Sequence, residues 1–195
     1  MIKSSVKSAL AKDLNAEVFD VTDAGLYFPR HGIEVSGEYF DRINEGAWQC
    51  TKNLVPKAAK IDMINTWLGS KAKPAGLYLA LFSGTAAPAD NWTSANFAAA
   101  ANEITSLTEG YTLPTRPQFT PTNAEDNTFI DNMQNTARLT IATASQLTVT
   151  GVALLTHSAR GGTTGVLISA TKYAAARVFQ DGDTYDVGYR FAVTA

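Results

Sequence analysis

Apolar and polar positions alternate along the last segment of the chain, residues 184–194. Tyr185, Val187, Tyr189, Phe191 and Val193 fall on one face, which is the pattern of a half-buried strand. Residues 77–83 are apolar on both faces, as expected for a central strand covered on both sides. The patterns of residues 77–83 and 184–194 therefore both predict β-strands.

Further strand-like segments lie between these two. Gly161-Gly162 and Asp181-Gly182 supply turn residues between neighbours. Three prolines within residues 111–121 restrict any strand there to a short one or to a sheet edge. Residues 84–110 form a long connection between strands, and residues 96–107 within it are the candidate for a short helix. The remaining predicted strands are residues 136–143, 147–155, 165–170 and 173–179. We therefore expect a mainly β fold, an antiparallel β-sandwich of jelly-roll-like form.

One helix is expected to lead into the sandwich, over residues 54–69. Pro56 suits its first turn and Gly69 its C-terminal end. Ile61, Ile64 and Leu68 recur at helical spacing on one face, with Trp67 at the margin of that face. This helix is expected to belong to a domain of residues 51–195.

Residues 1–50 show little periodicity and are predicted to form an N-terminal extended arm. Val6, Leu10 and Leu14 allow one short amphipathic helix, and glycines interrupt the rest. The arm nevertheless carries six large aromatic residues, which favour burial against its own sandwich or a neighbouring subunit. These candidate interface residues are Phe19, Tyr27, Phe28, Tyr39, Phe40 and Trp48.

Composition narrows the class of protein. The chain has 195 residues, 45% of them apolar, and a formal net charge of −2, which argues against a nucleic-acid partner. Residues 1–73 carry ten basic and nine acidic residues, whereas residues 74–195 carry six and nine. Cys50 is the single cysteine, so no intrachain disulfide forms and a reducing compartment is favoured. The N-terminal sequence has no apolar core of a signal peptide and no stretch that could span a bilayer, so no membrane partner is expected.

No catalytic motif is visible in the sequence, and we predict that the protein is not an enzyme. His31 and His157 are the two histidines, and neither lies in a recognisable motif. A dyad of Cys50 with a distant histidine has no local support. Residues 161–165 (GGTTG) lack the lysine and the following helix that a phosphate loop needs, so they are interpreted as a hairpin loop.

Three aspartates near the last turn, Asp181, Asp183 and Asp186, raise the question of a calcium site. Their spacing departs from the EF-hand loop, and a turn before a strand selects Asp and Gly for backbone reasons alone. We therefore predict no metal site, no cofactor and no catalytic residue in this chain.

The order of these segments resembles a recurrent group of structural proteins from tailed-bacteriophage virions. That group typically shows a "WYLALF" strand, a "GYxRPxF" segment, an "ITN" strand, a "GxxLxx" strand and a final "V..GDxLxVxYxF" strand. The similarity covers residues 54–195 and involves residues 77–82, 110–119, 129–141, 151–155 and 178–191.

The resemblance implies a non-enzymatic virion protein, a capsid cement or decoration protein that bridges and stabilises major capsid protein subunits. A tail, neck or baseplate/fibre-anchoring structural protein is the alternative. The implied partners are the major capsid protein and the chain itself, as a homodimer or homotrimer. The implied location is the virion, after assembly in the cytoplasm of the bacterial host.

Overall fold

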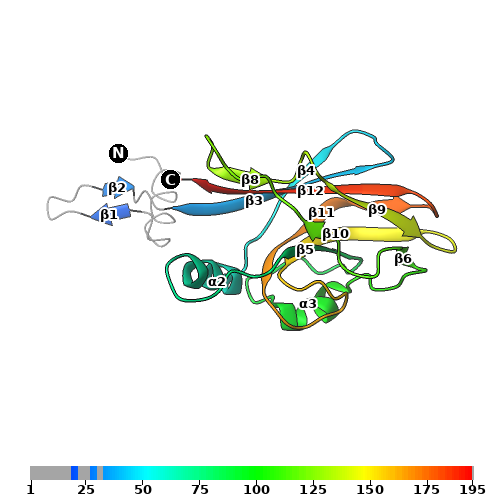
Figure 1. Ribbon diagram of the computed structural model, residues 1–195, viewed down its shortest axis with the longest axis horizontal. Coiled ribbons are helices and arrows are strands. Elements are labelled where there is room, and N and C mark those ends of the chain that lie inside the picture. The colour runs from blue at the N-terminus through cyan, green and yellow to red at the C-terminus, as the bar shows by residue number, and fades with distance from the viewer. Residues whose placement is uncertain (1–18, 22–26, 30–32, 195) are drawn as a thin grey trace, which may run out of the picture. The chain divides into compact units, whose positions relative to one another are not determined.

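The computed structural model describes residues 19–21, 27–29 and 33–194 (Figure 1). The chain divides into two compact units, of which the larger is Val35–Val193. In the smaller unit, β1 (Phe19–Val21) pairs antiparallel with β2 (Tyr27–Pro29). The larger unit holds the two main sheets and both described helices.

The smaller main sheet has the strand order β11-β10-β5-β7. Its centre is formed by β10 and β5, which pair antiparallel with Gly151 opposite Phe82. A Cβ at Gly151 would collide with the Phe82 ring, which explains the glycine at this position. The strands are β5 (Leu77–Phe82), β7 (Gln118–Phe119), β10 (Leu147–Leu155) and β11 (Leu167–Phe179).

The larger sheet has the order β4-β3-β12-β9-β6, and β8 also pairs with β12. Figure 1 shows β3 and β12 side by side in one layer and β5 and β10 in the other. The strands are β3 (Glu34–Ile43), β4 (Gln49–Lys52), β6 (Gly110–Tyr111), β8 (Phe129–Asp131), β9 (Ala137–Ala142) and β12 (Thr184–Thr194). Two antiparallel sheets facing each other confirm the predicted sandwich.

The main core lies between the sheets and is rich in tyrosine. The rings of Tyr39 and Tyr189 lie 4.5 Å apart between centroids, and Phe119 packs edge-on to Tyr189 at 5.7 Å. Two of the hydroxyl pairs are buried here: Tyr39 with Ser169 Oγ at 2.7 Å, and Tyr173 with Tyr185 at 2.7 Å. The buried Tyr111 hydroxyl has no hydrogen-bond partner among the described residues. Each of the two pairs joins a strand of one sheet to a strand of the other, which stabilises the way the sheets face each other.

A second apolar cluster lies on the outer face of the smaller sheet, beneath α3 (Ser94–Ala101). Phe82, Trp92 and Phe97 meet edge-to-face, with centroids 6.0–6.2 Å apart. This cover explains why β5 is apolar on both faces, as the sequence predicted. A short helix was expected over residues 96–107, and α3 begins and ends earlier.

The C-terminal strands follow the predicted segments closely. The bounds of β10 and β12 match, and residues 165–170 and 173–179 join into the single strand β11. Val149 pairs with Arg177 whereas Gly151 pairs with Lys172, so β11 bulges between these pairs. Of the predicted face of β12, Tyr185, Val187 and Tyr189 are fully buried. Phe191 and Val193 are half-buried.

The predicted limit of the arm at residue 50 is corrected by β3 and β4. Both strands belong to the larger sheet, and the compact unit begins at Val35. The buried positions of β3 are Gly37, Tyr39 and Asp41, so only one of the three is apolar and the period-2 pattern is hidden. The expected helix around Val6, Leu10 and Leu14, and His31, lie outside the described residues.

Candidate assembly surface

Helix α2 (Lys57–Trp67) turns its more apolar side away from the sandwich. The exposed fractions are 50% for Ile61, 59% for Ile64, 62% for Trp67 and 86% for Leu68. These four residues are called the α2 face below. They are the helix positions that the sequence singled out as an apolar face, but that face does not cover the core.

A different side of α2 packs on the domain. Ala59 is fully buried, Asp62 is 7% exposed, and Met63 packs against the main core. Just before the helix, Leu54 bridges to Ala170 of β11 through two backbone hydrogen bonds. The helix therefore packs on the domain through residues other than those of the α2 face.

Exposed basic residues lie in helix α2 and in the segment after it. Lys57, Lys60, Lys71 and Lys73 are all exposed, and Asp62 is the one carboxylate between residues 53 and 89. The Lys71 ammonium binds the Asp62 carboxylate. The other three lysines have no carboxylate partner within the part of the chain that the structure describes. The exposed surface at α2 therefore combines large apolar side chains with lysines.

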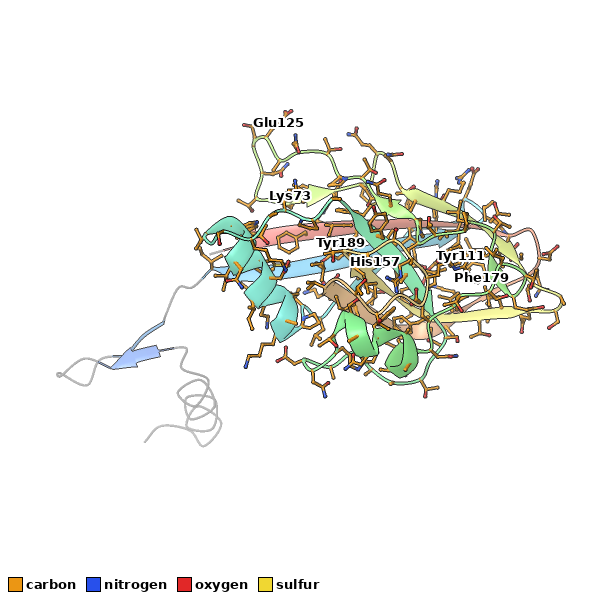
Figure 2. The ribbon with its side chains drawn as sticks, turned by 60° about the horizontal axis from the view of Figure 1, so that its bottom comes forward. Lys73, Tyr111, Glu125, His157, Phe179 and Tyr189 are labelled. Carbon is orange, nitrogen blue, oxygen red and sulfur yellow. The ribbon has the colours of Figure 1, made fainter. Side chains whose placement is uncertain are left out.

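A cavity of about 540 Å³ adjoins α2. Trp67 and Lys73 border it, and Phe119 and Tyr189 from the two sheets form part of its wall. Figure 2 shows Tyr189 between the sheets and Lys73 near α2. The remaining lining is largely apolar and includes Met63, Leu77, Ile130, Leu154, Ile168 and Phe191. A partner side chain lying over Trp67 would have an apolar recess beside it.

The structure places the six predicted interface residues in different environments. Tyr39 is fully buried and belongs to the chain's own core, so its prediction as an interface residue is wrong. Its hydroxyl is fixed by Ser169, which leaves no part of it for a partner. Phe19, Tyr27 and Phe28 lie in β1 and β2, whose side chains are outside the described part.

Phe40 and Trp48 remain accessible on the larger sheet side. Phe40 is half-buried, with the Arg190 guanidinium 5.3 Å from its ring centroid. Trp48 is 38% exposed, and the Arg42 guanidinium lies 4.5 Å from its ring. Both rings therefore carry a cation over one face, and each stays a prediction as an interface residue.

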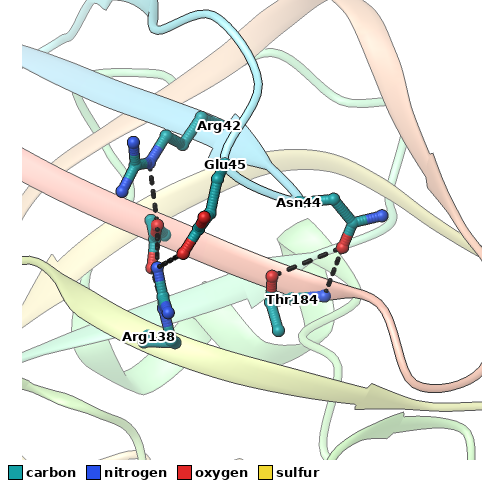
Figure 3. Close-up of polar contacts among 6 residues, drawn as sticks. Arg42, Asn44, Glu45, Arg138 and Thr184 are labelled. Atoms are coloured by element: carbon teal, nitrogen blue, oxygen red, sulfur yellow. Dashed lines mark hydrogen bonds and ion pairs between the residues drawn. The ribbon is translucent and has the colours of Figure 1, made fainter.

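An ion network crosses the three central strands of the larger sheet on its outer face (Figure 3). Asp186 of β12 accepts hydrogen bonds from Arg42 Nε of β3 at 2.8 Å and from Arg138 Nε of β9 at 2.7 Å. Arg138 also reaches Glu45 at 3.2 Å. The bond from Arg138, and then that from Arg42, lower the pKa of the Asp186 carboxyl. The network links β3, β12 and β9 to one another. Within it, the negative charge of Asp186 is paired with two arginines of the chain itself.

The other two aspartates considered as calcium ligands are also occupied by protein donors. Asp181 accepts from the Thr143 amide at 3.1 Å, and Asp183 from Asn44 Nδ2 and the Gln180 amide, each at 2.7 Å. These bonds fix the turn before β12, where Gly182 has φ +79°. Among the described residues, no group of three His, Cys, Asp or Glu side chains is placed to hold a metal ion.

The residues considered for catalysis have no activating environment in the described structure. Desolvation and the nearby Glu38 carboxylate raise the pKa of the Cys50 thiol, whereas a nucleophilic cysteine needs a lowered one. His157 Nδ1 accepts a hydrogen bond from the Ala159 amide in the β10–β11 loop. The His157 side chain therefore supports the loop that carries it.

Two fully or nearly buried arginines connect distant segments. Arg116 forms a double hydrogen bond with Glu103 and donates to the His157 and Gly162 carbonyl oxygens. Arg177 of β11 donates two hydrogen bonds to the Asp41 carboxylate of β3, between the two sheets. Removing one partner of a buried ion pair is strongly destabilising, whereas replacing both partners by apolar residues is often neutral. Neither pair has a signal in the local sequence pattern, since the partners are 13 and 136 residues apart.

Comparisons leave the family open. Neither the known protein-family models nor a search of curated proteins gives a match to this chain. Within the described residues, no helix has the length and apolar character needed to cross a membrane. The residue-level features above are therefore the basis for a functional proposal.

Proposed function

We propose that this chain is a non-enzymatic structural protein of a tailed-phage virion, a capsid cement protein that bridges major capsid protein subunits. The α2 face is the observation that carries the proposal. Four large apolar side chains stand outward from a helix that packs through other residues. Exposed apolar groups of this kind, rimmed by polar residues, mark contact sites for other proteins.

The rest of the domain supports an assembly role. The three aspartates considered as calcium ligands, Asp181, Asp183 and Asp186, hold turns and strands together. A two-sheet sandwich with buried ion pairs between segments gives a rigid body, and a cement protein needs rigidity and contact surfaces. The resemblance of residues 54–195 to phage structural proteins gives the virion context.

The proposal is tested by the number of copies of the protein in each purified phage particle, measured by quantitative mass spectrometry. A cement protein is expected in enough copies to cover the shell, because symmetry repeats its interface. The protein's absence from purified particles would contradict the proposal.

A tail, neck or baseplate/fibre-anchoring role is the alternative, since the same sandwich and contact face serve a small ring. The copy number decides between them: one ring's worth of subunits, with none on the shell, would favour this alternative.

A further inference from the structure

The chemistry of the α2 face defines what binds it. The face consists of Ile61, Ile64, Trp67 and Leu68. The exposed lysines of the same helix and the segment after it, Lys57, Lys60 and Lys73, have no carboxylate partner among the described residues. A binding segment therefore needs large apolar side chains at short spacing, with carboxylates between or beside them. Burial of the apolar groups supplies affinity, and the charges supply orientation and specificity.

The chain itself contains a segment of this composition outside the larger unit. Residues 13–21 read DLNAEVFDV, with acidic residues at Asp13, Glu17 and Asp20. Between and beside them lie Leu14, Val18, Phe19 and Val21, and no basic residue occurs from residue 13 to residue 29. The three carboxylates in this segment match in number and charge the three lysines Lys57, Lys60 and Lys73.

We propose that residues 13–21 of a second copy of the chain bind the α2 face. Every copy has one such segment and one such face. In a closed dimer or ring, each copy therefore binds a neighbour through its segment and is bound by a neighbour at its α2 face. Opposite charges also favour this encounter over a pairing of two α2 faces, whose lysines would repel each other. The inference rests on the proposed function and names a second copy of the chain as the partner of the α2 face, so that this face joins neighbouring copies on the shell.

A cysteine pair tests the contact in the full chain. In a Cys50→Ser background, Val18→Cys is placed in one preparation and Ile64→Cys in another, and the two are mixed under mild oxidation. We expect a disulfide-linked heterodimer on a non-reducing gel. As a matched control, Val178→Cys replaces an apolar residue that is 46% exposed on β11, and it should give at least tenfold less cross-linked product with Val18→Cys.

The same cysteines in one chain reveal the competing arrangement. If Val18→Cys/Ile64→Cys closes within a single chain while the mixture gives no heterodimer, the segment binds its own helix and the proposal is overturned. No cross-link in either preparation, or equal cross-linking of Val18→Cys to the Val178→Cys control, overturns it as well. None of these results affects the copy number in phage particles, so the proposed function is tested separately.

Charge variants give an independent readout by sedimentation velocity. Asp13→Asn/Glu17→Gln/Asp20→Asn and Lys57→Glu/Lys60→Glu/Lys73→Glu should each weaken self-association at least tenfold. Their mixture should recover heterodimers, because one preparation keeps the α2 face and the other keeps the acidic segment. Glu125→Gln/Asp126→Asn, in an exposed loop, is the matched control and should leave association unchanged. Unchanged association of both charge variants, or no recovery on mixing, would overturn the proposal.

Discussion

The guanidinium of Arg116 and the carboxylate of Glu103 face each other with both side chains fully buried, at 2.8 Å for Nε–Oε1 and 2.7 Å for Nη2–Oε2. Glu103 also accepts from the Gly161 amide at 3.1 Å. The pair thereby joins the segment after α3, the segment before β7 and the β10–β11 loop.

Arg116→Ala should lower the free energy of unfolding by about 3–5 kcal/mol, because it leaves a buried carboxylate without its charge partner. Urea unfolding at neutral pH measures the loss. The double variant Arg116→Met/Glu103→Leu should lose less than Arg116→Ala, since no buried charge remains. Equal losses in both variants would show that the ion pair is not what these segments depend on.

Asp186→Asn should lower the free energy of unfolding by about 1.5–3 kcal/mol at pH 7, the range for hydrogen bonds to charged groups. The lowered pKa of Asp186 also sets a pH dependence. The stabilisation is complete above the unfolded-state value of about 3.9 and is lost as pH falls through the lower folded-state pKa.

The parent protein should therefore lose stability below about pH 4 more steeply than Asp186→Asn does. Urea unfolding between pH 3 and 7 measures both slopes. Parallel slopes for the two proteins would remove the Arg42–Asp186–Arg138 network as a cause of acid sensitivity.

Phe97→Ala should cost about 3–5 kcal/mol, because the ring is fully buried between Phe82 and Trp92 beneath α3. Leu107→Ala is the control, since Leu107 is 51% exposed, and it should change stability by less than about 0.5 kcal/mol. Thermal unfolding followed by circular dichroism gives both values. A small effect of Phe97→Ala would mean that α3 contributes little to the fold.

The sequence predicted the strands whose apolar residues alternate or run together, such as β5, β10 and β12. It missed β3, since Gly37 and Asp41 occupy buried positions there. A Cβ at Gly37 would collide with the Tyr189 hydroxyl, and Asp41 pairs with Arg177. Both reasons depend on contacts with distant strands, which no local pattern contains.

The same limit applies to the candidate surface. Helical spacing identified Ile61, Ile64, Leu68 and Trp67 as one apolar side of a helix, and that spacing normally predicts the side that faces the core. Here Ala59 and Met63 pack inward instead. Which side of a helix a domain buries depends on the shape of the sheet beneath it, and the structure was needed to find the outward side.

The most direct test of the account is the incorporation of an α2-face variant into phage particles. Ile64→Asp/Leu68→Asp should leave the free energy of unfolding of the purified chain within about 0.5 kcal/mol of the parent, because both residues are exposed. Mass spectrometry of purified particles should then find many copies of the parent protein and at least tenfold fewer copies of the variant. A parent protein absent from particles, or a folded variant present in full number, would contradict the account.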